Sequence, residues 1–286
     1  MRHVTDADEP VPAEGAERVQ AGSLVLAAVV GVALAVTART SALALLIAVA
    51  VTQALLAAGW VFCSRMPGRK GALVLAALAA AGADVSVSIW PHGKLGTLLA
   101  VLGLAVPLLF IHQLMRGAAR SRIVQSLSGI ALLVLAEVAL AALLQLRHEF
   151  GGQTGGRVVA GVVAAAAGAL VVGYLVDLIA PLPRFDPDVP RGLLGVVASA
   201  GLGGSLGYLL LQSDRLGTFA SGRGAFIGAS LGALVGLLAV AVAFAERELP
   251  VRADGAGQRW RPFVGVLVPI SVLAPVAFLL CLAIRT

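Results

Sequence analysis

The chain has 286 residues, of which 59% are hydrophobic and only 13% are charged, and its mean hydropathy is +0.97. Soluble domains contain about 25% charged residues, so a water-soluble fold of this composition would lack a polar shell. The net charge of +6 does not indicate nucleic acid, because the basic residues fall between long apolar runs, where membrane topology accounts for them. We therefore predict an all-α, polytopic integral membrane protein whose solvent is the lipid bilayer.

Residues 1–20 form a polar segment with five acidic residues and two prolines. This composition predicts a disordered tail. A signal peptide would show a positive start followed directly by a short apolar core, which this segment lacks. We therefore expect the first apolar run to be retained as a membrane helix.

Nine apolar runs follow, each close to the roughly 20 residues that cross a bilayer. Short polar connections separate them, which predicts one membrane domain over 21–286 without a soluble insertion. Heavy use of alanine, glycine and arginine indicates a GC-rich bacterial genome. The predicted spans are 21–37, 41–63, 71–90, 95–115, 123–146, 158–180, 192–212, 224–244 and 263–284.

The basic residues predict the orientation of these spans. With nine spans, 14 of the 21 lysines and arginines fall on the side of the N-terminus and 7 on the other side. The positive-inside rule then places the N-terminus in the cytoplasm and the C-terminus outside the cell membrane.

Small residues recur at every fourth position in the seventh and eighth spans. Positions i and i+4 lie on one face of a helix, so each span presents a groove that lets another backbone approach closely. We expect the two spans to pack together as an antiparallel pair. The alternatives are a contact with a second copy or another membrane protein, and a pore lined by glycine backbone. The residues are Gly195, Ser199, Gly203 and Gly207, then Gly224, Gly228, Gly232 and Gly236.

Three carboxylates lie inside predicted spans: Asp84, Glu137 and Asp177. A charge at the bilayer centre costs at least about 2.5–3.5 kcal/mol, so such residues are candidates for function. In one interpretation Glu137 binds a proton or a cation, while Asp84 and Asp177 mark the outer and inner parts of a polar path. In the other, Asp84 and Asp177 lie at helix ends, and Glu137 is protonated and hydrogen-bonded to another helix.

The connection 181–191 is rich in proline and holds Arg184, Asp186 and Asp188. Oxygen ligands suit Mg²⁺ and arginine suits phosphate, so this loop is a candidate site on the cytoplasmic side. The alternative is a rigid interfacial turn of mixed charge. No other motif indicates a metal or a cofactor: P-loop, HExxH, CxxC and Gly-x-Ser-x-Gly patterns are missing, and we expect neither metal nor cofactor.

The stack of apolar helices with an acidic residue late in the sixth span loosely resembles the phosphatidate cytidylyltransferases. Those enzymes carry a C-terminal signature with a Lys-Asp pair, a His-Gly-Gly step and an Asp-Arg pair. This chain has no lysine after Lys94 and no histidine after His148. The signature is therefore missing, and the resemblance transfers no catalytic residue.

Three functions remain open at this point. The first is a transporter or permease in which Glu137 is the coupling group, and it predicts a water-accessible cavity at this residue. The second is a non-catalytic scaffold or subunit of a membrane complex, with its small-residue grooves exposed to a partner. The third is a lipid-processing enzyme using Asp177, Asp186 and Asp188. The missing motifs favour a protein that is not an enzyme.

Overall fold

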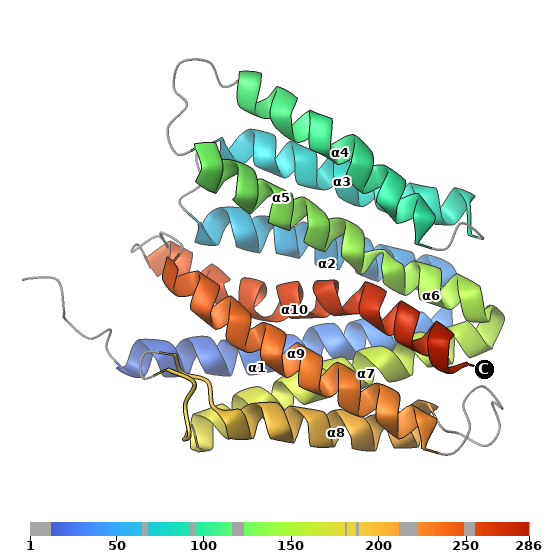
Figure 1. Ribbon diagram of the computed structural model, residues 1–286, viewed down its shortest axis with the longest axis vertical. Helices are drawn as coiled ribbons and strands as arrows, with labels where there is room; N and C mark the ends of the chain where they lie inside the picture. Colours follow the sequence, from blue (N-terminus) through green and yellow to red (C-terminus); the bar gives the residue numbers. More distant parts are fainter. Residues whose placement is uncertain are drawn as a thin grey trace, which may run out of the picture.

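The computed structural model describes residues 13–64, 68–91, 95–115, 123–180, 182–186, 189–211, 222–248 and 255–285. Within these ranges the chain forms helices and no named strand (Figure 1). The helices are α1 (Ala13–Thr40), α2 (Ala42–Cys63), α3 (Arg69–Ile89), α4 (Gly96–Met115), α5 (Ile123–Leu140), α6 (Ala142–Phe150), α7 (Gly152–Ile179), α8 (Leu193–Leu211), α9 (Arg223–Glu248) and α10 (Gly255–Ile284).

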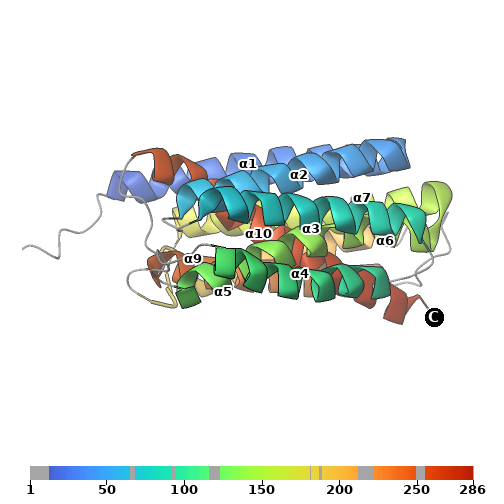
Figure 2. The ribbon, with the colours of Figure 1, turned by 90° about the horizontal axis from the view of Figure 1, so that it is seen from above.

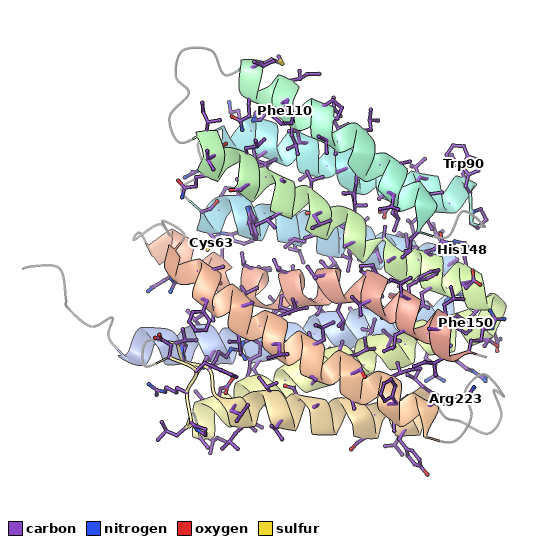
Figure 3. All side chains as sticks on the ribbon, in the orientation of Figure 1. Cys63, Trp90, Phe110, His148, Phe150 and Arg223 are labelled. Atoms are coloured by element: carbon purple, nitrogen blue, oxygen red, sulfur yellow. The ribbon has the colours of Figure 1, made fainter. Side chains whose placement is uncertain are left out.

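The helices run up and down between two ends of the bundle. We call the end at which α1 begins the N-terminal face and the end at which α10 finishes the C-terminal face; they lie at the left and the right of Figure 1. Cys63 marks the N-terminal face, whereas Trp90, His148, Phe150 and Arg223 lie toward the C-terminal face (Figure 3). The first helix therefore begins on one face of the bundle, and the last helix ends on the other.

The nine predicted membrane spans are confirmed over the described residues, where nine helical segments are long and apolar enough to cross a bilayer. Several boundaries differ from the prediction: α7 begins at Gly152 instead of 158, and α10 begins at Gly255 instead of 263. Helix α1 already begins at Ala13, inside the predicted tail, of which residues 1–12 lie outside the described ranges. The fifth span, predicted as one helix over 123–146, continues to Phe150 and is broken at Ala141 into α5 and α6.

The outward side chains fit lipid as the surrounding solvent. Leu43, Leu99, Leu104 and Leu209 are about two-thirds exposed, at 65–66%. Water around so many large apolar groups would be unfavourable, whereas hydrocarbon tails solvate them without penalty. The chain is therefore a membrane protein.

Helix α10 is the element that joins the two sides of the bundle. It packs against α2, α5 and α6 on one side and against α1, α7 and α9 on the other. Figure 1 shows α3, α4 and α5 on one side of it and α7, α8 and α9 on the other, and Figure 2 shows that it crosses the bundle obliquely. It contains Pro262, Pro269 and Pro275, each of which removes one backbone hydrogen bond from the helix.

Two tight connections place neighbouring helices antiparallel at the C-terminal face. Ser41 caps α2 by accepting a hydrogen bond from the backbone N–H of Ala44, which closes the hairpin between α1 and α2. Gly151 and Gly152 have φ values of 68° and 45°, a left-handed conformation that only glycine adopts readily, and they join α6 to α7.

Helices α8 and α9 make the most extensive contact in the bundle, followed by α7 with α8. A Cβ placed on Gly203 would lie 2.9 Å from Cα of Gly232, and one on Gly207 would lie 2.8 Å from Cα of Gly228. The two backbones thus touch where side chains are missing. The small-residue face of α8 also contacts α7, because Ser199 Oγ donates to the carbonyl of Ala169 at 2.7 Å. A Cβ on Gly195 would meet the carboxyl group of Asp177.

We predict that Gly228→Ala destabilises the protein by about 1–3 kcal/mol, the usual penalty for adding atoms to a closely packed contact. The added Cβ would lie 2.8 Å from Cα of Gly207 and against the carbonyl of Gly203. The measurement is thermal unfolding in detergent. Gly201→Ala is the matched control, because a Cβ at Gly201 of α8 has no neighbour within 4 Å. Equal unfolding temperatures for the two variants would contradict the proposed role of the contact.

Candidate functional sites

Two of the three intramembrane carboxylates lie together. Gln53 of α2 connects them: its Nε2 donates to Asp84 Oδ1 of α3 at 3.3 Å and to the backbone carbonyl of Glu137 of α5 at 3.0 Å. Glu137 is 0% exposed and lies within electrostatic range of Asp84. We call Gln53, Asp84 and Glu137 the carboxyl centre.

The carboxyl group of Glu137 is unusual in having no donor. Neither of its oxygens, both buried, accepts a hydrogen bond from any described residue, and the same holds for Gln53 Oε1. An ionised carboxylate without a donor or a cation is very costly in a medium of low dielectric constant. The arrangement therefore suits a carboxyl group that carries a proton or meets a cation.

The break between α5 and α6 follows Glu137 by one helical turn. The N–H of Ala141 bonds to the carbonyl of Val138 at 3.2 Å, and the N–H of Leu144 bonds to that of Ala141 at 3.0 Å. These are i to i−3 bonds, tighter than those of a regular α-helix. The rest of this face is small or polar, and Ser126, Gly129, Ala141 and Gln145 are all buried.

Asp177 of α7 belongs to a different cluster, at the N-terminal face. Its Oδ2 lies 3.1 Å from Nη1 of Arg191, and its Oδ1 accepts the backbone N–H of Gly192 at 2.9 Å. The guanidinium of Arg191 stacks on the ring of Tyr174, 3.7 Å from its centroid. Both members of the ion pair are buried. The structure thus joins Asp84 to Glu137 but holds Asp177 in a separate ion pair.

A cavity of about 60 Å³ lies beside this ion pair, between α1, α7, α9 and α10. We call it the arginine pocket. Arg261 and Glu246 face each other across 4.0 Å, and Tyr174 donates to the carbonyl of Gly265 at 2.9 Å. The lining residues are Val19, Gln20, Ser23, Tyr174, Pro190, Arg191, Ala239, Val242, Ala243, Glu246, Arg261 and Gly265.

The loop candidates are less well placed for joint chemistry. Arg184 is exposed and Asp186 is half-buried, while Asp188 lies outside the described residues. Asp177 is held in the ion pair with Arg191, and the magnesium and phosphate site suggested for this loop stays a prediction. Among the residues that the structure describes, no three histidine, cysteine or carboxylate side chains are grouped as metal ligands would be.

Several functional candidates were missed by sequence reasoning. Gln53 is one polar residue in a long apolar run, and that isolation was a usable signal. Arg191 and Arg261 were counted only among the basic residues that set topology, and Glu246 was given no role. Their positions at helix ends hid the fact that three separate segments bring them to one pocket.

The fold and these two sites define a polytopic α-helical membrane protein with one polar centre within its spans and a second at the N-terminal face. Comparisons with protein-family models, curated proteins and solved structures found no match.

We predict that Asp177→Leu destabilises the protein by about 3–5 kcal/mol, because it leaves Arg191 buried without its counter-ion. The double variant Asp177→Leu/Arg191→Met removes both charges and should be more stable than the single variant. Thermal unfolding in detergent of the wild type, the two single variants and the double variant gives the coupling free energy. Additive losses would show that the two charges do not stabilise each other.

Proposed function

We propose that the protein is a proton-coupled transporter of a bacterial cell membrane, with Glu137 as the group that carries the proton. One observation supports this above all: Glu137 is fully buried, and both carboxyl oxygens lack a hydrogen-bond donor among the described residues. A carboxyl group in such a place is stable while a proton neutralises it. It becomes unfavourable when the proton leaves, unless a cation or water takes its place.

The surroundings of Glu137 suit this exchange. Ionised Asp84 would repel ionised Glu137, so the pair favours holding at least one proton. Gln53 binds both residues and offers a free carbonyl oxygen, Oε1, to a hydrogen-bond donor or a cation. The break at Ala141 adds irregular backbone one turn away, a feature that transporter helices use beside ion sites.

Two further observations favour transport over the other functions. The small-residue grooves of α8 and α9 face each other, so they are occupied within the chain and not offered to a partner as a scaffold would require. Asp177, one of the carboxylates expected of a lipid-processing enzyme, is held in a buried ion pair with Arg191. In this proposal the positive-inside rule places the N-terminal face in the cytoplasm and the C-terminal face outside.

The test is solute-driven proton movement in liposomes that contain the purified protein and an internal pH-sensitive dye. A pH gradient is imposed, and a panel of inorganic cations, organic cations and amino acids is added one at a time. We expect at least one solute to move protons in the wild type, and Glu137→Gln to reduce this movement to the level of protein-free liposomes. The amide cannot release a proton but keeps the size of the side chain.

Glu149→Gln is the matched control, because Glu149 is an acidic residue of the adjoining α6 that pairs with Arg285 at the C-terminal face. It should retain the proton movement of the wild type. Size-exclusion chromatography and circular dichroism would establish that each variant is folded. Solute-driven proton movement that persists in Glu137→Gln, or that is missing from the wild type across the panel, would overturn the proposal.

A further inference from the structure

The arginine pocket is a second site, and its chemistry is independent of the carboxyl centre. We propose that it binds a zwitterionic group of the phosphoethanolamine type, with the phosphate on Arg261 and the ammonium on Glu246. The cavity of about 60 Å³ has room for roughly four to six water molecules at about 10–15 Å³ each, which is the size of a small charged group. The inference does not rest on the proposed transport function.

The charges of the pocket are paired unequally. Arg191 is already neutralised by Asp177, which lies 3.1 Å away and does not line the cavity. Glu246 lies within electrostatic range of both Arg261 and Arg191, and at 4.0 Å the closest atoms of Arg261 and Glu246 are too far apart for a hydrogen bond. The buried Nε of Arg261 donates to no described residue. One cation and one anion are thus held side by side without a full ion pair, as a bound zwitterion would require.

The hydrogen-bonding groups of the lining support the same ligand. The side-chain amide of Gln20 donates to the carbonyl of Pro190 at 2.7 Å, and Ser23 donates to that of Val19 at 2.9 Å. Each residue therefore uses one donor on the protein and has a side-chain oxygen that can accept. Together with Glu246, the pocket offers several acceptors for an ammonium and one guanidinium for a phosphate. A ligand with an anionic group alone would leave the acceptors unused and would meet Glu246.

The position of the pocket matches the depth of lipid headgroups. Trp260, the residue before Arg261, packs on Phe62 and Phe263, with ring centroids 5.4 Å and 4.9 Å apart. Aromatic clusters of this kind lie at the membrane–water interface. Cys63 lies within electrostatic range of both Glu246 and Arg261, and Figure 3 places it at the N-terminal face. Basic pockets between membrane helices at this depth bind phospholipid headgroups, so an aminophospholipid and a soluble phosphoethanolamine are the two sources of this chemistry.

The experiment measures ligand binding to the purified full-length protein by native mass spectrometry and by thermal shift. One arm offers phosphatidylethanolamine, phosphatidylglycerol or phosphatidylcholine, and the other offers soluble phosphoethanolamine or inorganic phosphate. We expect phosphatidylethanolamine to bind in preference to the other two lipids, because phosphatidylcholine has no N–H donor and phosphatidylglycerol has no cation. Binding of phosphoethanolamine without the lipid would assign the pocket to a soluble ligand, and binding of both would show that the headgroup suffices.

Three variants test whether the binding occurs in this pocket. Arg261→Met should weaken it by about tenfold or more, the loss expected for one charged hydrogen bond, and Glu246→Gln should remove the preference for ethanolamine over choline. Ala243→Phe should block binding by filling the cavity without changing any charge. Arg259→Met is the matched control, because Arg259 is exposed on the same part of α10 and does not line the pocket.

Two results would overturn the inference. The first is equal binding of all three lipids with no binding of phosphoethanolamine, which would show that the ammonium is not recognised. The second is an equal loss of binding in Arg259→Met and Arg261→Met, which would indicate general attraction by surface charge.

Discussion

A lipid bilayer offers no hydrogen bonds, and this constraint orders the whole structure. Every polar group within the spans must find its partner inside the protein or lose several kcal/mol. Most do so locally: Thr52 and Ser88 each donate to the carbonyl four residues earlier. Gln113 of α4 reaches Ser126 of α5 at 3.1 Å, so two neighbouring helices share one polar contact. Against this background, a buried polar group without a partner stands out as a candidate for function.

The architecture follows from how the helices meet when hydrophobic burial does not drive them together. Close backbone contact takes that role, which explains why glycine is dense in α8 and α9 and why their contact is the largest in the bundle. Helix α10 has a different role, because it contacts the helices on both sides of the bundle. Its three prolines each remove a backbone hydrogen bond, at three positions along the helix. Irregular backbone of this kind is tolerated in a membrane only where protein surrounds it.

Much of the fold could be predicted because the bilayer imposes a length and an apolar composition on each span. The nine spans were recognisable from these two properties alone. The break at Ala141 was not, because no proline or glycine marks it, and the adjoining segment reads Leu140-Ala141-Ala142-Leu143. Tertiary contacts of α6 with α7 and α10 must decide this local geometry. The tail was assigned too far along the chain, because Ala13–Gln20 is polar yet continues as helix into the apolar part of α1.

The candidate sites were predictable in kind but not in arrangement. The free-energy cost of placing a charge in the bilayer identified Asp84, Glu137 and Asp177 as candidates. The sequence alone does not show which helices are neighbours. The proximity of Asp84 and Glu137 depends on Gln53 lying between α3 and α5, and the isolation of Asp177 depends on Arg191 folding back from a loop. Residue type indicated which groups were costly, and only the packing shows which of them are compensated.

The two polar sites differ in how their charges are balanced, and this difference separates their roles. At the N-terminal face, Asp177 and Arg191 neutralise each other, with Gly192 and Tyr174 completing their contacts. That arrangement is stable without a further ligand, and it fixes the position of Arg191, which lines the arginine pocket. In the carboxyl centre, the amide of Gln53 bonds the carboxyl group of Asp84 and the backbone of Glu137, and the carboxyl group of Glu137 has no partner among the described residues, so a proton or a bound cation would have to balance its charge. A compensated charge fixes structure, whereas an uncompensated one makes the stability of the helices around it depend on what is bound.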